Sequence, residues 1–461
     1  MKVRYSYLQQ QFNDCDDLWE KLKEFVKTGD FTLGKPLQEF EDKFATLIGT
    51  KYAIGVNSGT DAIKLSLKAL GIGHGDEVIT TANTFVATVG AIAELGAKPV
   101  FVDCNDTFCM DVDLLEAAIT DKTKAIVPVH YTGYMTDMRK LLPIAEKYNL
   151  PVVEDACQSI LGAIEGKNAG TWGNTGSFSL HPLKNLNVWS DGGVIVTNDK
   201  KLDEKLRLLR NHGMVDRDHI DFWGVNMRLQ PLQAVVALEG LKTVRSVIKK
   251  RNINARQMDM GLKDLYPKVI LPKRLKNNHE TFALYMALFE KRDQLLKYLI
   301  KNKIEAKIHY PIPLHLQKAA RKLGYKKGDF KVAENLYNKV LKKDPNHSAS
   351  YNNLGLLFEK LKEFKKAQSC YEKVIQIDPK LAPAHHNLGV ILKKLGELEK
   401  AKECYGKATQ INPNFVEAHY ALGEICFLLN EHQKAKDCYE KVVQIDPYHL
   451  DAHNYIGITL L

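Results

Sequence analysis

Lys184 lies in a segment whose residue types suit covalent chemistry with an aldehyde. The segment Gly176–Gly193 reads GSFSLHPLKNLNVWSDGG, with Ser179 five residues before the lysine and a glycine pair at its end. A lysine amine condenses with an aldehyde to form a Schiff base, and small residues let the backbone approach a phosphate. The segment therefore indicates that Lys184 holds an aldehyde cofactor that carries a phosphate. A surface lysine in a loop is the alternative for this motif taken alone.

Three further residue groups suit the same ligand. The sequence VNSGTDAI at residues 56–63 reads as a strand end, a small-residue turn and a helix start, whose free amides suit a phosphate. The sequence VVEDACQ at residues 152–158 places Asp155 just beyond a buried strand, where a carboxylate is costly unless it is paired. Asp155 is either a helix N-cap or the partner of a protonated ring nitrogen. Phe85, in TTANTFVAT, either belongs to the core or stacks on a flat ring.

These residues follow the strands of a predicted α/β fold. Between residues 45 and 200, short apolar runs alternate with helical segments such as Asp61–Leu70 and Met138–Lys147. Such alternation predicts a parallel sheet, whose ligands bind at the carboxyl ends of the strands. We expect buried strands at Ala53–Val56, Glu77–Thr80, Pro99–Val102, Ala125–Val129 and Val152–Glu154.

The chain changes character after the predicted sheet. Residues 201–265 read as mainly helical. Residues 266–317 read as the start of a smaller α+β domain, in which the helix Arg292–Lys301 precedes a strand around Ile304–Ile308. A helical array follows. The predicted domains are a large domain at residues 1–250, a partial small domain at residues 251–330 and the array at residues 331–461.

Four classes of residue recur every 34 residues in the array. The period and the residue types resemble the tetratricopeptide repeat, a helix–turn–helix unit that stacks into an all-α solenoid. Three complete repeats span residues 348–381, 382–415 and 416–449, with a half repeat at each end. The recurring positions are Pro345, Pro379, Pro413 and Pro447; Gly355, Gly389, Gly423 and Gly457; Tyr337, Tyr371, Tyr405 and Tyr439; and Ala333, Ala367, Ala401 and Ala435.

The junction between the two parts falls near Phe330. Gly328–Ala333 (GDFKVA) aligns at an offset of 34 residues with Lys362–Ala367. The helix Lys331–Lys342 therefore reads as the second helix of a repeat whose first helix is missing. Two genes that were similar over this short segment could have joined there. We therefore expect that the chain arose by gene fusion near Phe330.

Composition limits the classes of partner. The sequence contains no run of about 18 apolar residues, so no transmembrane helix is predicted. The N-terminus has no apolar signal-peptide core, so we expect the protein in the cytoplasm. The net charge of +10 is carried largely by lysines interspersed with glutamates, which indicates solvated helix faces rather than a nucleic-acid surface. The 8 cysteines form no CxxC pair and have no histidine cluster beside them, so no metal site is expected.

The motifs of the first 330 residues resemble, in their order, those of the DegT/DnrJ/EryC1/StrS family of sugar aminotransferases. The resemblance implies pyridoxal 5'-phosphate as cofactor and the aspartate-aminotransferase fold (fold type I), with a three-layer αβα large domain and a small α+β domain. It implies that Lys184 carries the cofactor as a Schiff base and that Asp155 pairs with the pyridine nitrogen. The other contacts that it implies are Gln158 at the ring oxygen, Phe85 on the ring face, Gly59, Thr60 and Ser179 at the phosphate, and Asn226 (in GVNMRL) at the phosphate in the neighbouring subunit.

The same resemblance implies a reaction and an assembly. An amino donor, L-glutamate, would give its amino group to the ketone of a nucleotide-linked sugar, with Lys184 carrying the proton and a homodimer as the active form. The dehydratase branch of the family carries histidine at the lysine position, so Lys184 favours a transaminase. The sequence KIHYPIPLHLQ at residues 307–317 matches a stretch that borders the family's substrate site, which makes His309 and Tyr310 substrate candidates.

The sequence departs from the family after residue 330. The family continues there with a proline, a helix, a short strand and a final helix, whereas this chain continues with repeats. A small domain that lacks a strand would leave an open sheet edge and apolar surface. The alternative function is therefore an inactive or impaired aminotransferase-like scaffold whose array binds a protein or peptide. The first helices of the repeats carry polar residues that could bind an extended peptide or could simply be exposed to solvent. These residues are Asn352, Asn353, His386 and Asn387.

Overall fold

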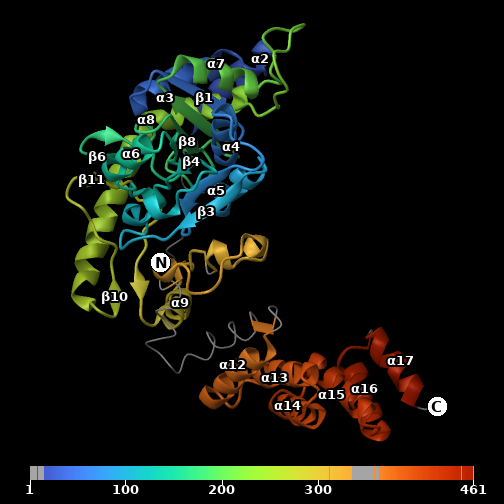
Figure 1. The fold of residues 1–461 in the computed structure, drawn as a ribbon. Coiled ribbons are helices and arrows are strands. Elements are labelled where there is room, and N and C mark those ends of the chain that lie inside the picture. Colours follow the sequence, from blue (N-terminus) through green and yellow to red (C-terminus); the bar gives the residue numbers. More distant parts are fainter. Residues whose placement is uncertain are drawn as a thin grey trace. The chain divides into compact units, whose positions relative to one another are not determined.

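The chain forms two compact units in a computed structural model. The structure describes residue 8 and residues 15–310, 312–334, 358–359, 363–447 and 449–459. Contacts divide the chain into Met1–Tyr337, which is α/β, and Asn338–Leu461, which is helical (Figure 1). The sequence predicts the start of the array at residue 331, a few residues before this division at residue 337. The predicted domain bounds remain predictions.

A central mixed sheet organises the first unit. One four-stranded part has the order β1-β9-β8-β5, and a three-stranded part has the order β3-β2-β4. Isolated parallel bridges, Ile126 with Val152 and Val129 with Asp155, join β4 to β5. The strands are β1 Tyr52–Val56, β2 Glu77–Thr81, β3 Lys98–Val102, β4 Thr123–Val127, β5 Val153–Asp155, β8 Thr175–Ser179 and β9 Gly193–Thr197.

The sheet is not parallel throughout, so that prediction is wrong at one side. Strand β2 runs parallel to β3 and β4, and β5 runs parallel to β8. Strand β9 runs antiparallel to both of its neighbours, β8 and β1. The connection from β8 to β9 closes on itself through a 2.7 Å hydrogen bond from Leu180 N to Gly192 O. The chain therefore returns without the crossover helix that a parallel neighbour needs.

Helices cover both faces of this sheet, which confirms the three-layer αβα prediction. Ile79 and Ile126 pack on one face with α3, α6 and α8. Val78 and Val127 point to the other face, where α4, α5 and α7 lie. Neighbouring residues of a strand point to opposite faces, so a strand buried on both sides is apolar throughout. The helices are α2 Asp16–Thr28, α3 Lys35–Ile48, α4 Gly59–Ala69, α5 Val86–Ala93, α6 Met138–Lys147, α7 Lys200–Leu209 and α8 Pro231–Leu262.

The rest of the first unit is a smaller α+β part. Strand β10 Val269–Ile270 pairs with β12 Leu288–Phe289, and α9 Arg292–Lys301 has the predicted bounds. Strand β11 Asn278–His279 pairs with β6 Ala163–Ile164, which also pairs with β7 Lys167–Asn168. The strand expected around Ile304–Ile308 is wrong, because residues 305–310 have no regular structure. They end instead in a turn at Tyr310, whose φ is 50°.

The predicted strands of the large domain are otherwise confirmed, with end points that differ by up to two residues. At the junction, Phe330 and Ala333 are buried in one cluster with Ala82, Phe101 and Cys104. The part of the helix Lys331–Lys342 after residue 334 lies outside the described residues, as do Asn352 and Asn353. The described start of that helix thus packs on the first unit.

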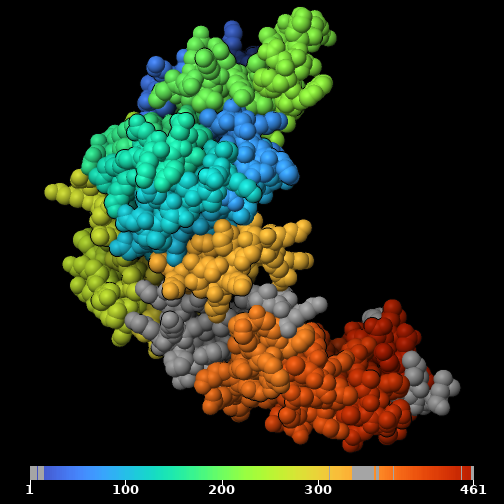
Figure 2. Space-filling view, viewed as in Figure 1, coloured from blue at the N-terminus to red at the C-terminus, as the bar shows by residue number. Residues whose placement is uncertain are grey.

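The second unit alternates two kinds of helix at the predicted period, and its described part is stacked from orange to red in Figure 2. In α13 and α15, a glycine of the first helix meets a tyrosine of the next helix. A Cβ atom on Gly389 would lie 2.6 Å from Tyr405, and one on Gly423 would lie 2.7 Å from Tyr439. The helices are α12 Phe364–Ile377, α13 Ala382–Lys394, α14 Leu398–Ile411, α15 Val416–Leu428, α16 His432–Ile445 and α17 Leu450–Thr459.

A histidine repeats the same contact in three successive first helices. The imidazole Nε2 atoms of His385, His419 and His453 lie 2.9–3.0 Å from the carbonyl oxygens of Pro379, Pro413 and Pro447 respectively. Each imidazole donates to a carbonyl six residues earlier and so ties the inter-repeat turn to the helix after it. None of the described helices is both long and apolar enough to span a bilayer.

Candidate functional site

Lys184 lies in the loop that closes the β8–β9 hairpin. Its backbone N donates a 2.8 Å hydrogen bond to His181 O, which forms a tight turn at the lysine. The next residue, Asn185, is buried and donates from Nδ2 to Thr281 O at 2.9 Å. One main-chain hydrogen bond and one side-chain bond of the neighbouring Asn185 therefore hold the lysine's position. The amine of Lys184 makes no hydrogen bond or ion pair with the described residues.

Asp155 is the last residue of β5 and is buried. Thr88 Oγ1 donates to its Oδ2 at 2.7 Å, and Cys157 N donates to its Oδ1 at 3.2 Å. Strand β5 lies beside β8, so the carboxylate and the Lys184 loop meet at the same edge of the sheet. The N-cap alternative for Asp155 does not apply, because no helix starts there.

Small residues form a cradle at the start of α4. Ser58 caps this helix by accepting from Asp61 N at 3.1 Å, and Gly59 and Thr60 lie in its first turn. A Cβ atom on Gly59 would lie 2.7 Å from Ser179 Cβ and 2.8 Å from Cys157 Sγ. Amides of a first turn have no partner within the helix and attract an anion. The predicted phosphate residues Gly59, Thr60 and Ser179 are thus brought together.

The Asp-Gly-Gly segment is needed for the same close approach. A Cβ atom on Gly193 would lie 2.2 Å from Ser58 O, which no side chain permits. The start of β9 is therefore pressed against the turn that begins α4. This contact explains the glycine that follows the Lys184 loop.

Four rings gather near this edge from two parts of the unit. Phe85, at the N-cap of α5, stacks on Tyr310 with ring centroids 5.5 Å apart and an angle of 26°. His309 lies 3.7 Å from the Tyr310 ring and 5.8 Å from the Tyr131 ring. Phe85 is 46% exposed, so part of this residue is accessible to a ligand. The two substrate candidates thus lie beside the residue expected to stack on the cofactor ring.

Gln158 and Asn226 have different surroundings. Gln158 is buried, and its Oε1 accepts from Thr132 N at 2.8 Å. Asn226 is exposed in the segment between α7 and α8, where its backbone bridges to Asn211. No hydrogen bond given for the described residues joins the Asn226 side chain to Lys184 or Asp155. Within one subunit, the structure does not bring Asn226 into the group.

Burial and charge set the protonation states of the group. Burial lowers the pKa of Lys184 below the usual lysine value, while the nearby Cys157 and Asp155 oppose that shift. Burial lowers the pKa of His309 to about 4, and the charge of Lys184 adds to this shift. Burial raises the pKa of the Cys157 thiol, and Asp155 raises it further. A lysine of lowered pKa has more neutral amine, which is the form that attacks an aldehyde.

These residues fit pyridoxal phosphate on observations independent of the motifs. His309 Nε2 is a buried polar atom for which the described residues provide no hydrogen-bond partner. The Gly59–Ser179 contact leaves no room for a side chain, as a phosphate cradle requires. Asp155 would hold the ring nitrogen, Gln158 the ring oxygen, and Lys184 the aldehyde carbon. No cluster of three or more metal-ligating side chains occurs in the described part of the chain.

Sequence reasoning missed several members of this group. Thr88 contacts Asp155 directly, Tyr131 contacts His309, and Thr281 holds Asn185. The spacing of Thr84 and Thr88 places them on one face of a helix start, which was the one available signal for Thr88. Tyr131 and Thr281 carry no local pattern, since their positions follow from tertiary packing.

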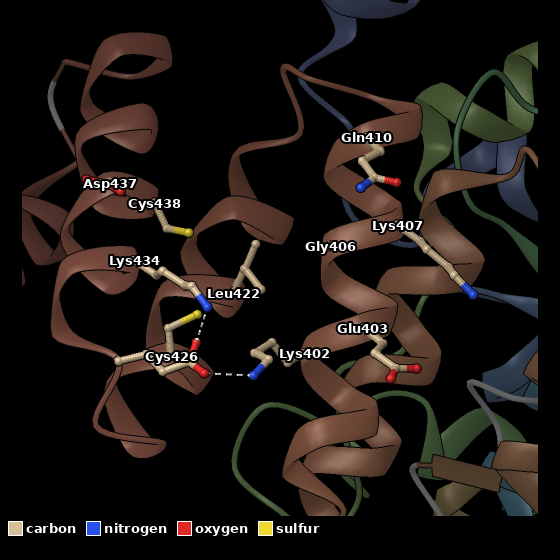
Figure 3. A pocket seen from close by; sticks show the side chains of 11 residues that line it. Lys402, Glu403, Gly406, Lys407, Gln410, Leu422, Cys426, Lys434, Asp437 and Cys438 are labelled. Atoms are coloured by element: carbon tan, nitrogen blue, oxygen red, sulfur yellow. Dashed lines mark hydrogen bonds and ion pairs between the residues drawn. The ribbon is translucent and has the colours of Figure 1, made fainter.

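Two hollows occur on the described helical unit. Figure 3 shows one between α14, α15 and α16, with Lys402, Cys426 and Cys438 turned toward it. Lys402 bonds to Glu431 at its rim with a 3.0 Å contact. The second is formed mainly by α13 and α15 and includes His386, one of the predicted peptide-facing residues. Both hollows are lined by lysines and glutamates together, so neither favours a ligand of one charge.

Comparison with known proteins gives matches for both units. The DegT/DnrJ/EryC1/StrS aminotransferase family model matches residues 14–349. The tetratricopeptide repeat model matches residues 348–381, 382–415 and 416–449.

Individual relatives agree with the first match. The chain is 36% identical to the dTDP-3-amino-3,4,6-trideoxy-alpha-D-glucose transaminase of Micromonospora megalomicea subsp. nigra, over 73% of this chain and 91% of that protein. It is 38% identical to the UDP-2-acetamido-2-deoxy-3-oxo-D-glucuronate aminotransferase of Pseudomonas aeruginosa, over 67% and 86%. Among solved structures, NtdA of Bacillus subtilis with bound cofactor PMP superposes with a TM-score of 0.68 at 32% identity, over 73% of this chain and 79% of that one.

Proposed function

This chain belongs to the DegT/DnrJ/EryC1/StrS aminotransferase family, and from that premise we propose that it aminates a nucleotide-linked keto-sugar with L-glutamate as donor. It is a sugar-nucleotide aminotransferase by family, and its cofactor is pyridoxal phosphate. The observation that carries the proposal is the convergence of Lys184, Asp155 and the Gly59–Ser179 cradle at one edge of the sheet. The tetratricopeptide array adds a surface for a protein or peptide partner.

The bound cofactor supplies an electron sink for the carbanion that forms when a proton leaves the donor's α-carbon. Lys184 would hold the cofactor's aldehyde carbon through its amine, and its lowered pKa favours the neutral form that such bonding needs. The same amine would carry the proton that leaves the donor's α-carbon. Asp155, whose carboxylate accepts from Thr88 Oγ1 and Cys157 N, would pair with the ring nitrogen.

The sugar half of the site is assigned to the ring cluster. His309 is neutral above about pH 4, so its Nε2 offers one hydrogen bond to a sugar hydroxyl without adding a charge. Tyr310 presents its ring beside Phe85. The names of both curated relatives place the reaction at carbon 3, which is the position that we propose for this chain.

We propose a homodimer as the active form. The segment between α7 and α8 projects from the first unit, visible in green in Figures 1 and 2. Its Trp223 is 86% exposed, and Val215 and Ile220 are exposed as well. An exposed apolar arm of this kind indicates a protein interface. Asn226 lies in the same segment and would reach the phosphate in the neighbouring subunit.

Two half-reactions test the function on the purified full-length chain. With pyridoxal phosphate added, we expect a visible absorbance band that L-glutamate removes and that Lys184→Ala never develops. UDP- or dTDP-linked 3-keto-sugar should then restore the band and yield an amino sugar, identified by mass and by NMR at carbon 3. If the cofactor binds but no amino donor changes its spectrum, the chain is instead the impaired scaffold described above.

A further inference from the structure

Two threonines form a buried chain of hydroxyl groups that ends on Asp155. Thr84 Oγ1 and Thr88 Oγ1 lie 2.8 Å apart, and Thr88 Oγ1 lies 2.7 Å from Asp155 Oδ2. Thr84 is 2% exposed, Thr88 is 0% exposed and Asp155 is 6% exposed. The chain is therefore shielded from water, where hydrogen bonds to a charge are strong.

Proton counting gives this chain a direction. An ionised carboxylate can only accept, so the single hydroxyl proton of Thr88 points to Asp155. Thr88 has no second proton, and its oxygen must then accept from Thr84 across the 2.8 Å contact. The order is Thr84 to Thr88 to Asp155, with every donor turned toward the carboxylate.

The hydroxyl chain and one backbone amide together bind both carboxylate oxygens of Asp155. Cys157 N binds Oδ1 at 3.2 Å, and Thr88 binds Oδ2 at 2.7 Å. The Cys157 thiol also interacts with the Asp155 carboxylate. With one oxygen fixed by the β5 end and the other by α5, the carboxylate cannot turn without losing a buried partner.

The same threonines flank the residue expected to cover the ring. Phe85 lies between them in sequence at the N-cap of α5, and Thr88 N donates to Phe85 O at 3.2 Å. The chain thus joins the element that carries Phe85 to the strand that carries Asp155. A substitution at Thr88 would therefore change the position of Phe85 relative to Asp155.

We propose that Thr88, supported by Thr84, is a positioning residue that orients Asp155 toward the cofactor's ring nitrogen. This inference rests on the proposed function of the same site. Neither threonine touches the reacting atoms, and both act through Asp155.

The test compares Thr88→Val with Thr88→Ser in the full-length protein. Valine keeps the branched shape and removes the donor, whereas serine keeps the donor and removes a methyl group. A hydrogen bond to a charged group contributes about 1.5–3 kcal/mol, so Thr88→Val should weaken pyridoxal phosphate binding roughly 10–100-fold. Thr88→Ser should stay within about 3-fold of wild type, and Thr84→Val should lie between them.

Two readouts separate orientation from packing. The dissociation constant is measured by titrating the apoprotein with pyridoxal phosphate, and the visible spectrum of the bound cofactor is recorded for each variant. We expect a changed spectrum in Thr88→Val and a wild-type spectrum in Thr88→Ser. Equal loss in both variants would mean that the methyl group matters rather than the hydroxyl, and would overturn the inference. So would a Thr88→Val protein with wild-type affinity and spectrum.

Failure of the proposed function gives a different pattern. Wild-type protein would then bind no cofactor, or bind it without a response to L-glutamate, whatever residue stands at position 88. If wild type responds to glutamate while the threonine variants match it in affinity and spectrum, only the positioning role fails. Thermal melting of each variant without cofactor is the fold control. If Thr88→Val does not fold, Thr84→Val tests the same hydroxyl chain in its place.

Discussion

At the scale of single residues, the properties of Lys184 come from its surroundings. Its amine is desolvated by the closed hairpin loop, while Asp155 and Cys157 favour its charged form. Desolvation is the largest cause, so the pKa falls. The fraction of neutral amine at a given pH is therefore larger than for a solvent-exposed lysine.

The rate of cofactor capture should follow this shift. In the apoprotein, the rate of Schiff-base formation should rise with pH, and its midpoint should lie below 10.5, the ordinary lysine value. Asp155→Asn removes a charge that raises the Lys184 pKa, so the midpoint should move further down. Stopped-flow absorbance from pH 6 to pH 10 measures both. A midpoint that rises in Asp155→Asn would contradict the electrostatic account.

At the scale of elements, Glu154 shows how one side chain holds several segments. It is fully buried and accepts from Gly170 N at 2.9 Å, Trp172 N at 2.7 Å and Gly173 N at 2.8 Å. His130 Nε2 donates to the same carboxylate at 2.8 Å. Strand β5 is thereby tied to the loop before β8 and to the end of β4, which fixes the backbone of the adjacent Asp155.

Removal of this carboxylate should be costly. Glu154→Ala leaves four donors without a partner, of which Gly170 N and His130 Nε2 are buried, and breaking a buried group of this kind costs about 3–5 kcal/mol. The free energy of unfolding, from urea denaturation, measures the loss. Glu165→Gln is the matched control, since its side chain is 51% exposed and its change should stay within about 0.5 kcal/mol.

The glycine–tyrosine contact between the two helices of a repeat makes an equally specific prediction. Gly423→Ala would place a methyl group 2.7 Å from the Tyr439 ring, and such overpacking costs about 1–3 kcal/mol. Gly406→Ala in α14 meets nothing within 4 Å and should stabilise the unit by roughly 0.5–1 kcal/mol, because glycine disfavours a helix. Thermal melting followed at 222 nm compares the two. Similar effects of the same sign would show that the ring contact is not what selects glycine.

At the scale of the whole molecule, the chain carries two units with separate cores. The hydrophobic clusters of the sheet contain residues of the first unit, and those of α12–α17 contain residues of the second. The junction residues belong to the first unit, where Asp103 accepts from Val332 N and Ala333 N, each at 2.8 Å. Two cores of this kind are expected to unfold independently.

The full-length protein should therefore show two unfolding transitions, of which only one responds to cofactor. Pyridoxal phosphate at one hundred times its dissociation constant should stabilise the first unit by about 2.7 kcal/mol and leave the second unchanged. Differential scanning calorimetry resolves the transitions. A single cooperative peak that shifts as a whole would argue against independent units.

Much of this arrangement was predictable from local signals. The alternation of apolar runs places the strands, and the 34-residue period places the helices of α12–α17. The motifs around Lys184 and Asp155 predicted a cofactor site, and the structure brings these residues to the same end of the sheet. These features depend on side-chain periodicity and turn chemistry, which lie within a few residues of one another in sequence.

The sequence by itself determined the family and the repeat register, and it predicted Lys184 as the cofactor lysine. Only the tertiary structure decided that β9 runs antiparallel, that residues 305–310 have no regular structure instead of forming a strand, and that Thr88 holds Asp155. Each of these depends on partners far apart in the chain, such as Thr88 and Asp155, whose approach follows from packing α5 beside β5. Local pattern carries no information about such pairs, because many chain paths are compatible with the same run of residues.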